Sequence, residues 1–273
     1  MDNKTSIGIS INEKERAKAP RRSPSITSSI SSAETATSNT QAPSTFNPSR
    51  SLFINSQGVR LIRLPVASYE LEVNIHNPDG SVAYVSRREK RSSGDATLSS
   101  PQFGDLLKTC YFFGPHRDPV IRSASNDNTL DTDTNTDTAV NASTPEIKVV
   151  GKWNSRTQYF TTFYGDSFQW RYIQCDDPRW NCKKLLVLES LENNNPDRIG
   201  RRVAQLVRNE HTRPQGASKS AAGNGGELLL DDRAIGVEVD EALVVATCLL
   251  MLKKEIDRRR MAEIAVFGIA AAC

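Results

Sequence analysis

The stretch DEALVVATCLLMLKKEIDRRR, residues 240–260, decides the fold of this 273-residue chain. Its segment 242–252 contains a single residue that is not apolar, Thr247. Asp240 is a residue type that caps helix N-termini, and the basic cluster after residue 252 complements the negative end of a helix dipole. The sequence therefore predicts an α-helix over about residues 240–260.

A helix that is apolar on all sides is buried on all sides. The eleven residues 242–252 extend roughly 16 Å as a helix, which is about half the hydrocarbon thickness of a bilayer. The helix is therefore expected to lie inside protein, with residues 253–260 emerging into water. Only the chain before it is available to enclose it.

The chain before the helix has the pattern of short strands. Runs rich in branched and aromatic residues alternate with Gly, Pro, Asn or Asp at roughly ten-residue intervals, which is typical of a sandwich or barrel. Because the helix must be enclosed, we predict a mostly β fold: a closed antiparallel β-barrel around a central apolar C-terminal α-helix. The expected strands are 59–64, 69–76, 82–86, 106–113, 120–123, 147–151, 158–164, 168–173, 184–190, 199–208 and 227–231.

Two of these strands predict which face is buried. In 168–172, FQWRY, three aromatic residues point one way and two polar residues the other, so one face should be buried and one wet. In 199–208, simple alternation places Arg202 and Arg208 on one face and Arg201 on the other, which predicts a basic outer surface. The segment GNGG at 223–226 lacks the Gly-Lys-Ser or Gly-Lys-Thr ending of a phosphate-binding loop, and we interpret it as a flexible turn.

Several stretches resemble a fungal tubby C-terminal-like family of unknown function, within the superfamily of tubby proteins, phospholipid scramblases and LURP-one-related proteins. The resemblance is best over residues 168–261. It implies a barrel around the helix and no established catalytic residues. Tubby proteins bind phosphoinositides through basic residues, whose positions have no residue-by-residue match in this chain. The stretches are FQWRY (168–172), LLVLE (185–189), GRRVAQLVR (200–208), AGNGG (222–226), DEALVVA (240–246) and KKEIDRRR (253–260).

Composition divides the chain into segments. Residues 1–50 are rich in Ser, Thr, Ala, Pro and Asn and are expected to form a disordered tail, as is an insertion at about 123–145. The folded domain is expected over 51–262, followed by an apolar tail at 263–273. The tail 1–50 holds seven basic and four acidic residues, which leaves 28 of each sign of the chain's 35 basic and 32 acidic residues for the rest. This balance argues against a nucleic-acid partner.

No residue pattern indicates a cofactor, a metal or a membrane-spanning segment. The five cysteines have no Cys-x-x-Cys spacing, and no apolar run approaches the ~20 residues of a transmembrane helix. Because the N-terminus also has no apolar signal region, an intracellular location is expected, cytoplasmic or peripheral to a membrane, with the nucleus as a further option.

No catalytic residues are predicted, because His76, His116 and His211 lack paired spacing and no Gly-x-Ser-x-Gly motif occurs. The hypothesis is a non-enzymatic binding or scaffolding module that contacts an anionic membrane surface or a protein partner. Three alternatives stay open: an ordinary solvated surface, regulation through the disordered tail, and an enzyme with an unrecognised site near His116 or His211. The candidate lipid-headgroup residues are Arg171, Lys183, Lys184, Arg201, Arg202 and Arg208.

Overall fold

A computed structural model describes residues 46–60, 71–90, 93–112, 117–124, 145–152, 155–195 and 199–270, with side chains as far as residue 265. All of them belong to one folded unit. The expected tail at 1–50 and the insertion at 123–145 fall almost entirely outside these ranges, as does His116.

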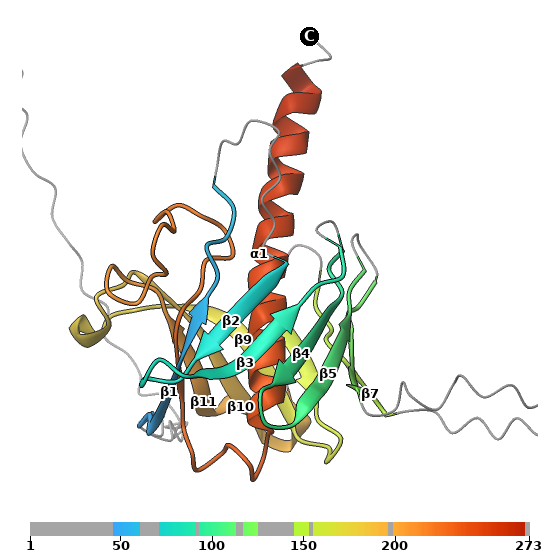
Figure 1. Ribbon diagram of the computed structural model, residues 1–273, viewed down its shortest axis with the longest axis vertical. Coiled ribbons are helices and arrows are strands. Elements are labelled where there is room, and N and C mark those ends of the chain that lie inside the picture. The colour runs from blue at the N-terminus through green and yellow to red at the C-terminus, as the bar shows by residue number, and fades with distance from the viewer. Residues whose placement is uncertain are drawn as a thin grey trace, which may run out of the picture. The chain divides into compact units, whose positions relative to one another are not determined.

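Twelve strands form one antiparallel sheet that wraps around a single long helix (Figure 1). In spatial order the sheet runs β7-β6-β5-β4-β3-β2-β1-β12-β11-β10-β9-β8. The strands are β1 (Arg50–Asn55), β2 (Glu72–His76), β3 (Val82–Arg87), β4 (Ala96–Ser100), β5 (Gly104–Cys110), β6 (Val120–Ser123), β7 (Glu146–Lys148), β8 (Gln158–Thr161), β9 (Ser167–Gln174), β10 (Lys184–Leu191), β11 (Ile199–Val207) and β12 (Gly226–Leu230); two short 3-10 helices, η2 (Pro178–Trp180) and η3 (Glu192–Asn194), flank β10.

The two edges of the sheet meet through one bridge. Val150, just after β7, and Tyr159 of β8 exchange both backbone hydrogen bonds, at 2.8 Å and 2.7 Å. The predicted closed barrel is therefore confirmed, and among the residues that the structure describes this pair is the bridge that joins the two edges.

Ten of the eleven expected strands correspond to strands of the sheet. The expected strand at 59–64 is represented among the described residues only by an isolated bridge between Val59 and Ala222. The prediction missed β1 and β4. β4 (ATLSS) carries one large apolar residue, Leu98, so its strand conformation depends on pairing with β3 and β5 rather than on local pattern.

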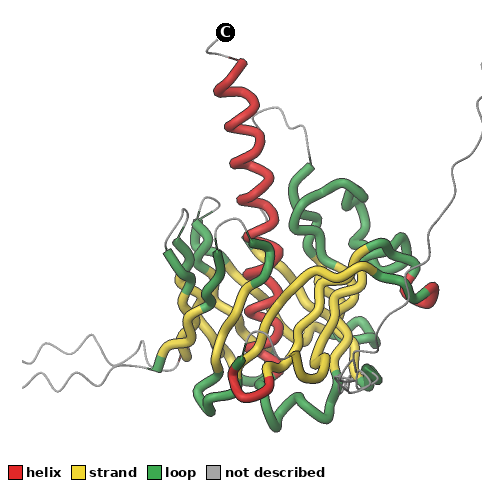
Figure 2. Tube along the Cα trace, turned by 180° about the vertical axis from the view of Figure 1, so that it is seen from behind, coloured by secondary structure: helices red, strands yellow, loops and turns green. Residues whose placement is uncertain are grey.

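Helix α1 (Glu241–Ala270) passes through the ring of strands, as Figure 2 shows from the opposite side. The Asp240 side chain caps it by accepting hydrogen bonds from the backbone N–H groups of Ala242 and Leu243. Thr247, the one polar residue of the apolar run, is fully buried; its hydroxyl accepts from the indole N–H of Trp170 at 3.0 Å and donates to the Leu243 carbonyl. The central apolar helix is therefore confirmed.

The C-terminal part of α1 differs from the prediction in two ways. The helix continues to Ala270, past the predicted end at about residue 260, because residues 261–267 contain no Gly or Pro that would end it there. Lys253 and Asp257 are also buried rather than wet, and Lys253 Nζ donates to Asp257 Oδ1 at 2.6 Å, an i,i+4 ion pair inside the barrel.

The outer face of β9, β10 and β11 is covered rather than wet. A second apolar cluster of Leu185, Val187, Val207 and Leu229 lies there, and Phe46 and Trp180 pack against it. Gln169 of β9 is buried as well. The expectation of a wet face along β9 is therefore wrong for Gln169, whereas the Arg171 side chain is 34% exposed.

Candidate anion-binding cleft

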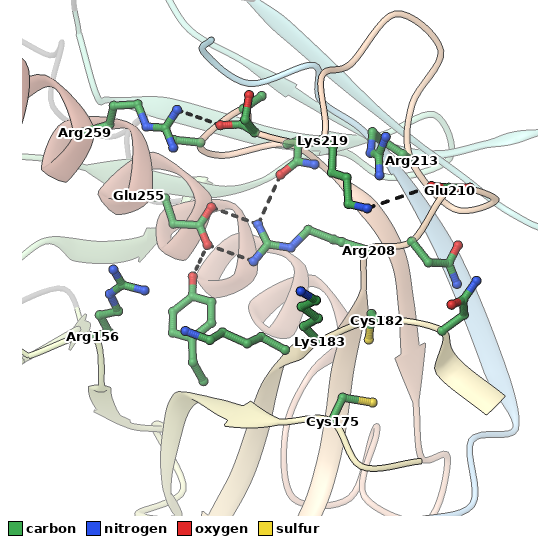
Figure 3. Close-up of a pocket in the computed structure, with 18 of the residues that line it drawn as sticks. Arg156, Cys175, Cys182, Lys183, Arg208, Glu210, Arg213, Lys219, Glu255 and Arg259 are labelled. Carbon is green, nitrogen blue, oxygen red and sulfur yellow. Dashed lines mark hydrogen bonds and ion pairs between the residues drawn. The ribbon is translucent and has the colours of Figure 1, made fainter. Parts of the chain in front are cut away.

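A cleft of about 1110 Å³ opens where α1 leaves the barrel (Figure 3). One wall is the β9–β10 connection, and another is the chain that follows β11. The floor is formed by residues 221–224 and by α1 from Glu255 to Ala262. The cleft therefore collects residues from segments that are far apart in sequence.

The β9–β10 connection is shaped by two local signals. Asp177 caps η2, and its carboxylate accepts from the backbone N–H of Arg179 at 3.0 Å. Asn181 ends the turn in the left-handed region, with φ of 42°. Because the hairpin then resumes pairing, Lys183 and Lys184 are held at the cleft wall with exposed side chains.

The floor of the cleft is an ionic network around Glu255. Arg208 donates two hydrogen bonds to the Glu255 carboxylate, each of 2.9 Å, and the Gly223 N–H donates a third at 2.9 Å. The Tyr172 hydroxyl also donates to this carboxylate. Burial acts to raise the pKa of Glu255, but Arg208 and these donors outweigh it and hold that pKa below its ordinary value. Glu255 is therefore a charged structural residue.

Gly223 allows the floor to lie against the helix. Its φ is +73°, and a Cβ atom at this position would meet Cγ1 of Ile256 at 2.5 Å. GNGG forms a turn at Gly223, as predicted, but residues 221–226 are buried and packed rather than free in solvent. The Gly223 N–H is already bound to Glu255, which leaves it unavailable to a phosphate.

The cleft carries a strong excess of positive charge. Its lining has eight basic and four acidic side chains. Among the residues that the structure describes, two of the basic ones have carboxylate partners, Arg208 with Glu255 and Lys219 with Glu210. The six without a carboxylate partner are Arg156, Lys183, Lys184, Arg213, Arg258 and Arg259.

Two guanidinium nitrogens at the cleft are buried without any hydrogen-bond partner in the described part of the chain, Arg213 Nε and Arg258 Nη2. The other nitrogens of Arg258 bind only backbone carbonyls, those of Lys254 and Ser155. Arg259 likewise donates to the Ser220 carbonyl at 2.6 Å. Backbone carbonyls position these cations but do not neutralise them, so the cleft is suited to an anion.

Three of the six predicted headgroup residues lie at this cleft and three do not. Lys183, Lys184 and Arg208 line it. Arg171 is bound to Glu189 on the outer face of the barrel, with Nε to Oε2 at 2.6 Å. Arg202 lies over the Phe46 ring, and Arg201 is bound to Glu238 at 2.6 Å. The six therefore form no single patch.

A β-bulge explains why the predicted faces of β11 are wrong. Leu188 pairs with Ala204 whereas Glu189 pairs with Arg202, so Val203 is an extra residue in the ladder. Beyond the bulge Arg208 points to the helix, where its side chain is only 16% exposed, and Arg202 points outward. The two arginines that alternation placed on one face thus lie on opposite faces.

Sequence reasoning missed five basic residues of the cleft. Arg258 and Arg259 belong to the basic cluster that ends the predicted helix, so a signal for them was present. The others lie in connections whose path is set by tertiary contacts, and local pattern does not place them. The three are Arg156, Arg213 and Lys219.

Cys175 and Cys182 lie at the same cleft. Burial and a hydrogen bond that the Cys182 thiol donates to Cys175 raise the pKa of Cys182 to about 11, so its thiol is protonated at neutral pH. His211 is exposed and does not line the cleft. The described residues include no group of three or more His, Cys, Asp or Glu side chains placed to hold a metal ion. In the same part of the chain, no helix is long and apolar enough to cross a membrane.

The chain matches no protein-family model, no curated protein and no solved structure. Membership of the tubby C-terminal-like family therefore stays a prediction. The barrel around a helix agrees with it, and no comparison tests it.

Proposed function

We propose that this domain is a non-enzymatic binding module whose cleft holds a phosphate-bearing anion, the headgroup of an anionic membrane lipid of the phosphoinositide type. The observation that supports the proposal is the set of six cleft cations without a carboxylate partner among the described residues. Cations without counterions repel one another and raise the electrostatic energy of the cleft. A bound polyanion offsets this repulsion.

The composition and size of the cleft favour a ligand with several phosphates. Arginine side chains bind phosphate oxygens with paired N–H donors, and lysines add point charges. Each basic residue close to an anionic headgroup contributes on the order of 1 kcal/mol. The volume of about 1110 Å³ lies just above the ~300–1,000 Å³ of typical small-molecule sites, which suits a headgroup better than a single inorganic phosphate.

Membership of the tubby C-terminal-like family is part of this proposal. A barrel around a central helix is compatible with it, and so is a basic site on that barrel. The argument for the ligand nevertheless rests on the cleft, because fold alone does not imply function.

Isothermal titration calorimetry with soluble inositol bisphosphate tests the proposal. We expect saturable binding that weakens as salt is raised, because exposed charges are screened over about 10 Å at 0.1 M ionic strength. The double variant Lys183→Ala/Lys184→Ala should bind about thirtyfold more weakly, because each lysine contributes on the order of 1 kcal/mol.

The matched control is Lys90→Ala/Lys148→Ala, which removes the same charge from exposed lysines outside the cleft. Equal loss of binding in the two double variants would indicate a nonspecific charge effect and contradict the proposed site. Absence of binding by the unaltered protein would contradict the proposed function itself.

A further inference from the structure

The last turns of α1 extend beyond the barrel. Figures 1 and 2 show this from opposite sides, with the helix backbone continuing well past the strands. We call residues 261–270, MAEIAVFGIA, the helix tip. Ala262 and Ala265 are exposed, and the Ile264 side chain is 62% exposed.

The sequence of the helix tip is unsuited to water. Glu263 is its one charged residue, and the other nine are apolar or Gly. The sequence of this segment therefore has no repeated polar positions from which a helix could form a polar stripe. A helix of this composition needs an apolar environment on all sides rather than a groove against one face.

The helix tip begins at the basic cleft. Arg258 and Arg259, which lie one turn before it, line the cleft, and so does Ala262 of the tip itself. The positive charge of the six uncompensated cations is therefore concentrated around the point where the apolar segment starts. An apolar helix end with a cationic base can place its apolar residues in hydrocarbon and its cations at the level of anionic headgroups.

Charge decides between two apolar environments. A second copy of the chain packed tip to tip would bring two cationic clefts together, and like charges repel. An anionic bilayer offers hydrocarbon for the tip and negative headgroups for its base. The ten residues of the tip extend about 15 Å, which is enough to enter one leaflet and too short to cross the ~30 Å hydrocarbon core.

We infer that the helix tip inserts into one leaflet of an anionic membrane while the adjacent cleft holds a headgroup of the same leaflet. This inference rests on the proposed function for the headgroup, and adds to it a defined orientation: the end of the barrel from which α1 emerges faces the membrane.

Vesicle co-sedimentation of the full chain tests the inference. The vesicles are phosphatidylcholine with a minor fraction of phosphatidylinositol bisphosphate, and pure phosphatidylcholine is the comparison. Ile264→Asn removes an apolar side chain of the tip without changing charge. We expect it to weaken vesicle binding about tenfold or more, since burying one Ile side chain contributes at least that factor to a partition equilibrium.

Val237→Asn is the matched control, because Val237 is 77% exposed and precedes the opposite, N-terminal end of α1. It should bind vesicles like the unaltered protein. A thermal melt of each variant confirms folding, and exposed positions such as these should leave the melting temperature within a few degrees of the original.

Titration with soluble inositol bisphosphate separates the two proposals. Ile264→Asn should bind the soluble headgroup normally, which places its defect in membrane insertion. If the unaltered protein fails to bind the soluble headgroup yet sediments with anionic vesicles in an Ile264-dependent way, the insertion stands and the cleft proposal fails.

Two results would overturn the insertion. One is vesicle binding by Ile264→Asn equal to that of the unaltered protein. The other is a dimer in solution that Ile264→Asn converts to a monomer, because the tip would then be covered by a second copy of the chain.

Discussion

Arg208, directly after β11, and Glu255, on α1, form a bidentate ion pair across the floor of the cleft, with both N–O distances at 2.9 Å. Each side chain is 16% exposed. The pair joins the barrel wall to the helix at the place where the proposed ligand binds, so it fixes the geometry of the cleft without contributing net charge to it.

Replacing Arg208 with Met should destabilise the domain by about 3 kcal/mol, because it leaves the buried Glu255 carboxylate without its counterion. Urea unfolding measures the change. Arg87→Met is the control, since Arg87 forms an exposed ion pair with Glu72 at 3.1 Å and exposed pairs contribute about 1 kcal/mol or less. Similar losses in the two variants would contradict a structural role for the pair at the cleft floor.

The same carboxylate predicts a loss of stability in acid. The pKa of Glu255 is lower in the folded chain than its ordinary value of 4.5. As the pH falls below that ordinary value, the unfolded chain takes up the proton first, so the stability present at neutral pH declines until the folded carboxylate is also protonated. Glu255→Gln should show a shallower decline between neutral and acid pH in urea unfolding, and a parallel decline would argue that other carboxylates are responsible.

Lys254 predicts a gain of stability in alkali. Burial lowers its pKa from 10.5 to about 8, with Asp118 opposing that shift and Arg258 adding to it. Between these two values the unfolded chain holds a proton that the folded chain has lost, so this residue's contribution to stability rises with pH. Relative to the unaltered protein, Lys254→Met should lack this rise from pH 8 to 10, whereas Lys148→Met, at an exposed site, should retain it.

Gly223→Ala tests the close approach of the cleft floor to the helix. The added Cβ would be 2.5 Å from Ile256 Cγ1 and would also face strain from the positive φ. Gly80 has a similar φ, +85°, but open space around it, so Gly80→Ala isolates the backbone strain of roughly 1–2 kcal/mol. We expect Gly223→Ala to lower the free energy of unfolding more than Gly80→Ala does, as measured by thermal or urea unfolding. Equal losses would mean that residues 221–224 can move away from Ile256 without loss of stability.

Because α1 is enclosed by the barrel, a charge should have very different effects on stability at Val245 and at Val237. Val245 is fully buried inside the barrel, whereas Val237 is 77% exposed. Val245→Asp places an unpaired charge in the core at a cost of several kcal/mol, against a typical domain stability of about 5–15 kcal/mol. Circular dichroism should show that variant unfolded or strongly destabilised and Val237→Asp near normal. A stable Val245→Asp variant would contradict the enclosed helix.

Local pattern was sufficient for the architecture. An apolar run such as 242–252 is too short to cross a membrane as a helix, so it must be enclosed by protein. The two-residue alternation of β9 and the continuous apolar run 185–188 of β10 indicate strands without knowledge of their partners. The helix end was not predictable in the same way, because Lys253 and Asp257 are charged in sequence yet satisfy each other inside the barrel.

The cleft was only half predictable because its residues depend on register. One additional residue, Val203, reverses the faces of β11 and moves Arg208 from the expected outer surface to the helix side. Arg213 reaches the cleft through a connection that has no periodic pattern. The sequence therefore indicated that basic residues matter, but it did not show which of them line the cleft and which lie on the outer face. That division depends on the three-dimensional path of the chain.

The most direct test of the binding site is a crystal structure of the protein with soluble inositol bisphosphate. We expect the phosphate groups in the cleft, within hydrogen-bond distance of Lys183 or Lys184 on one wall and of Arg258 or Arg259 on the helix. Density for the ligand at the outer face beside Arg171 and Arg202, with the cleft empty, would contradict the account.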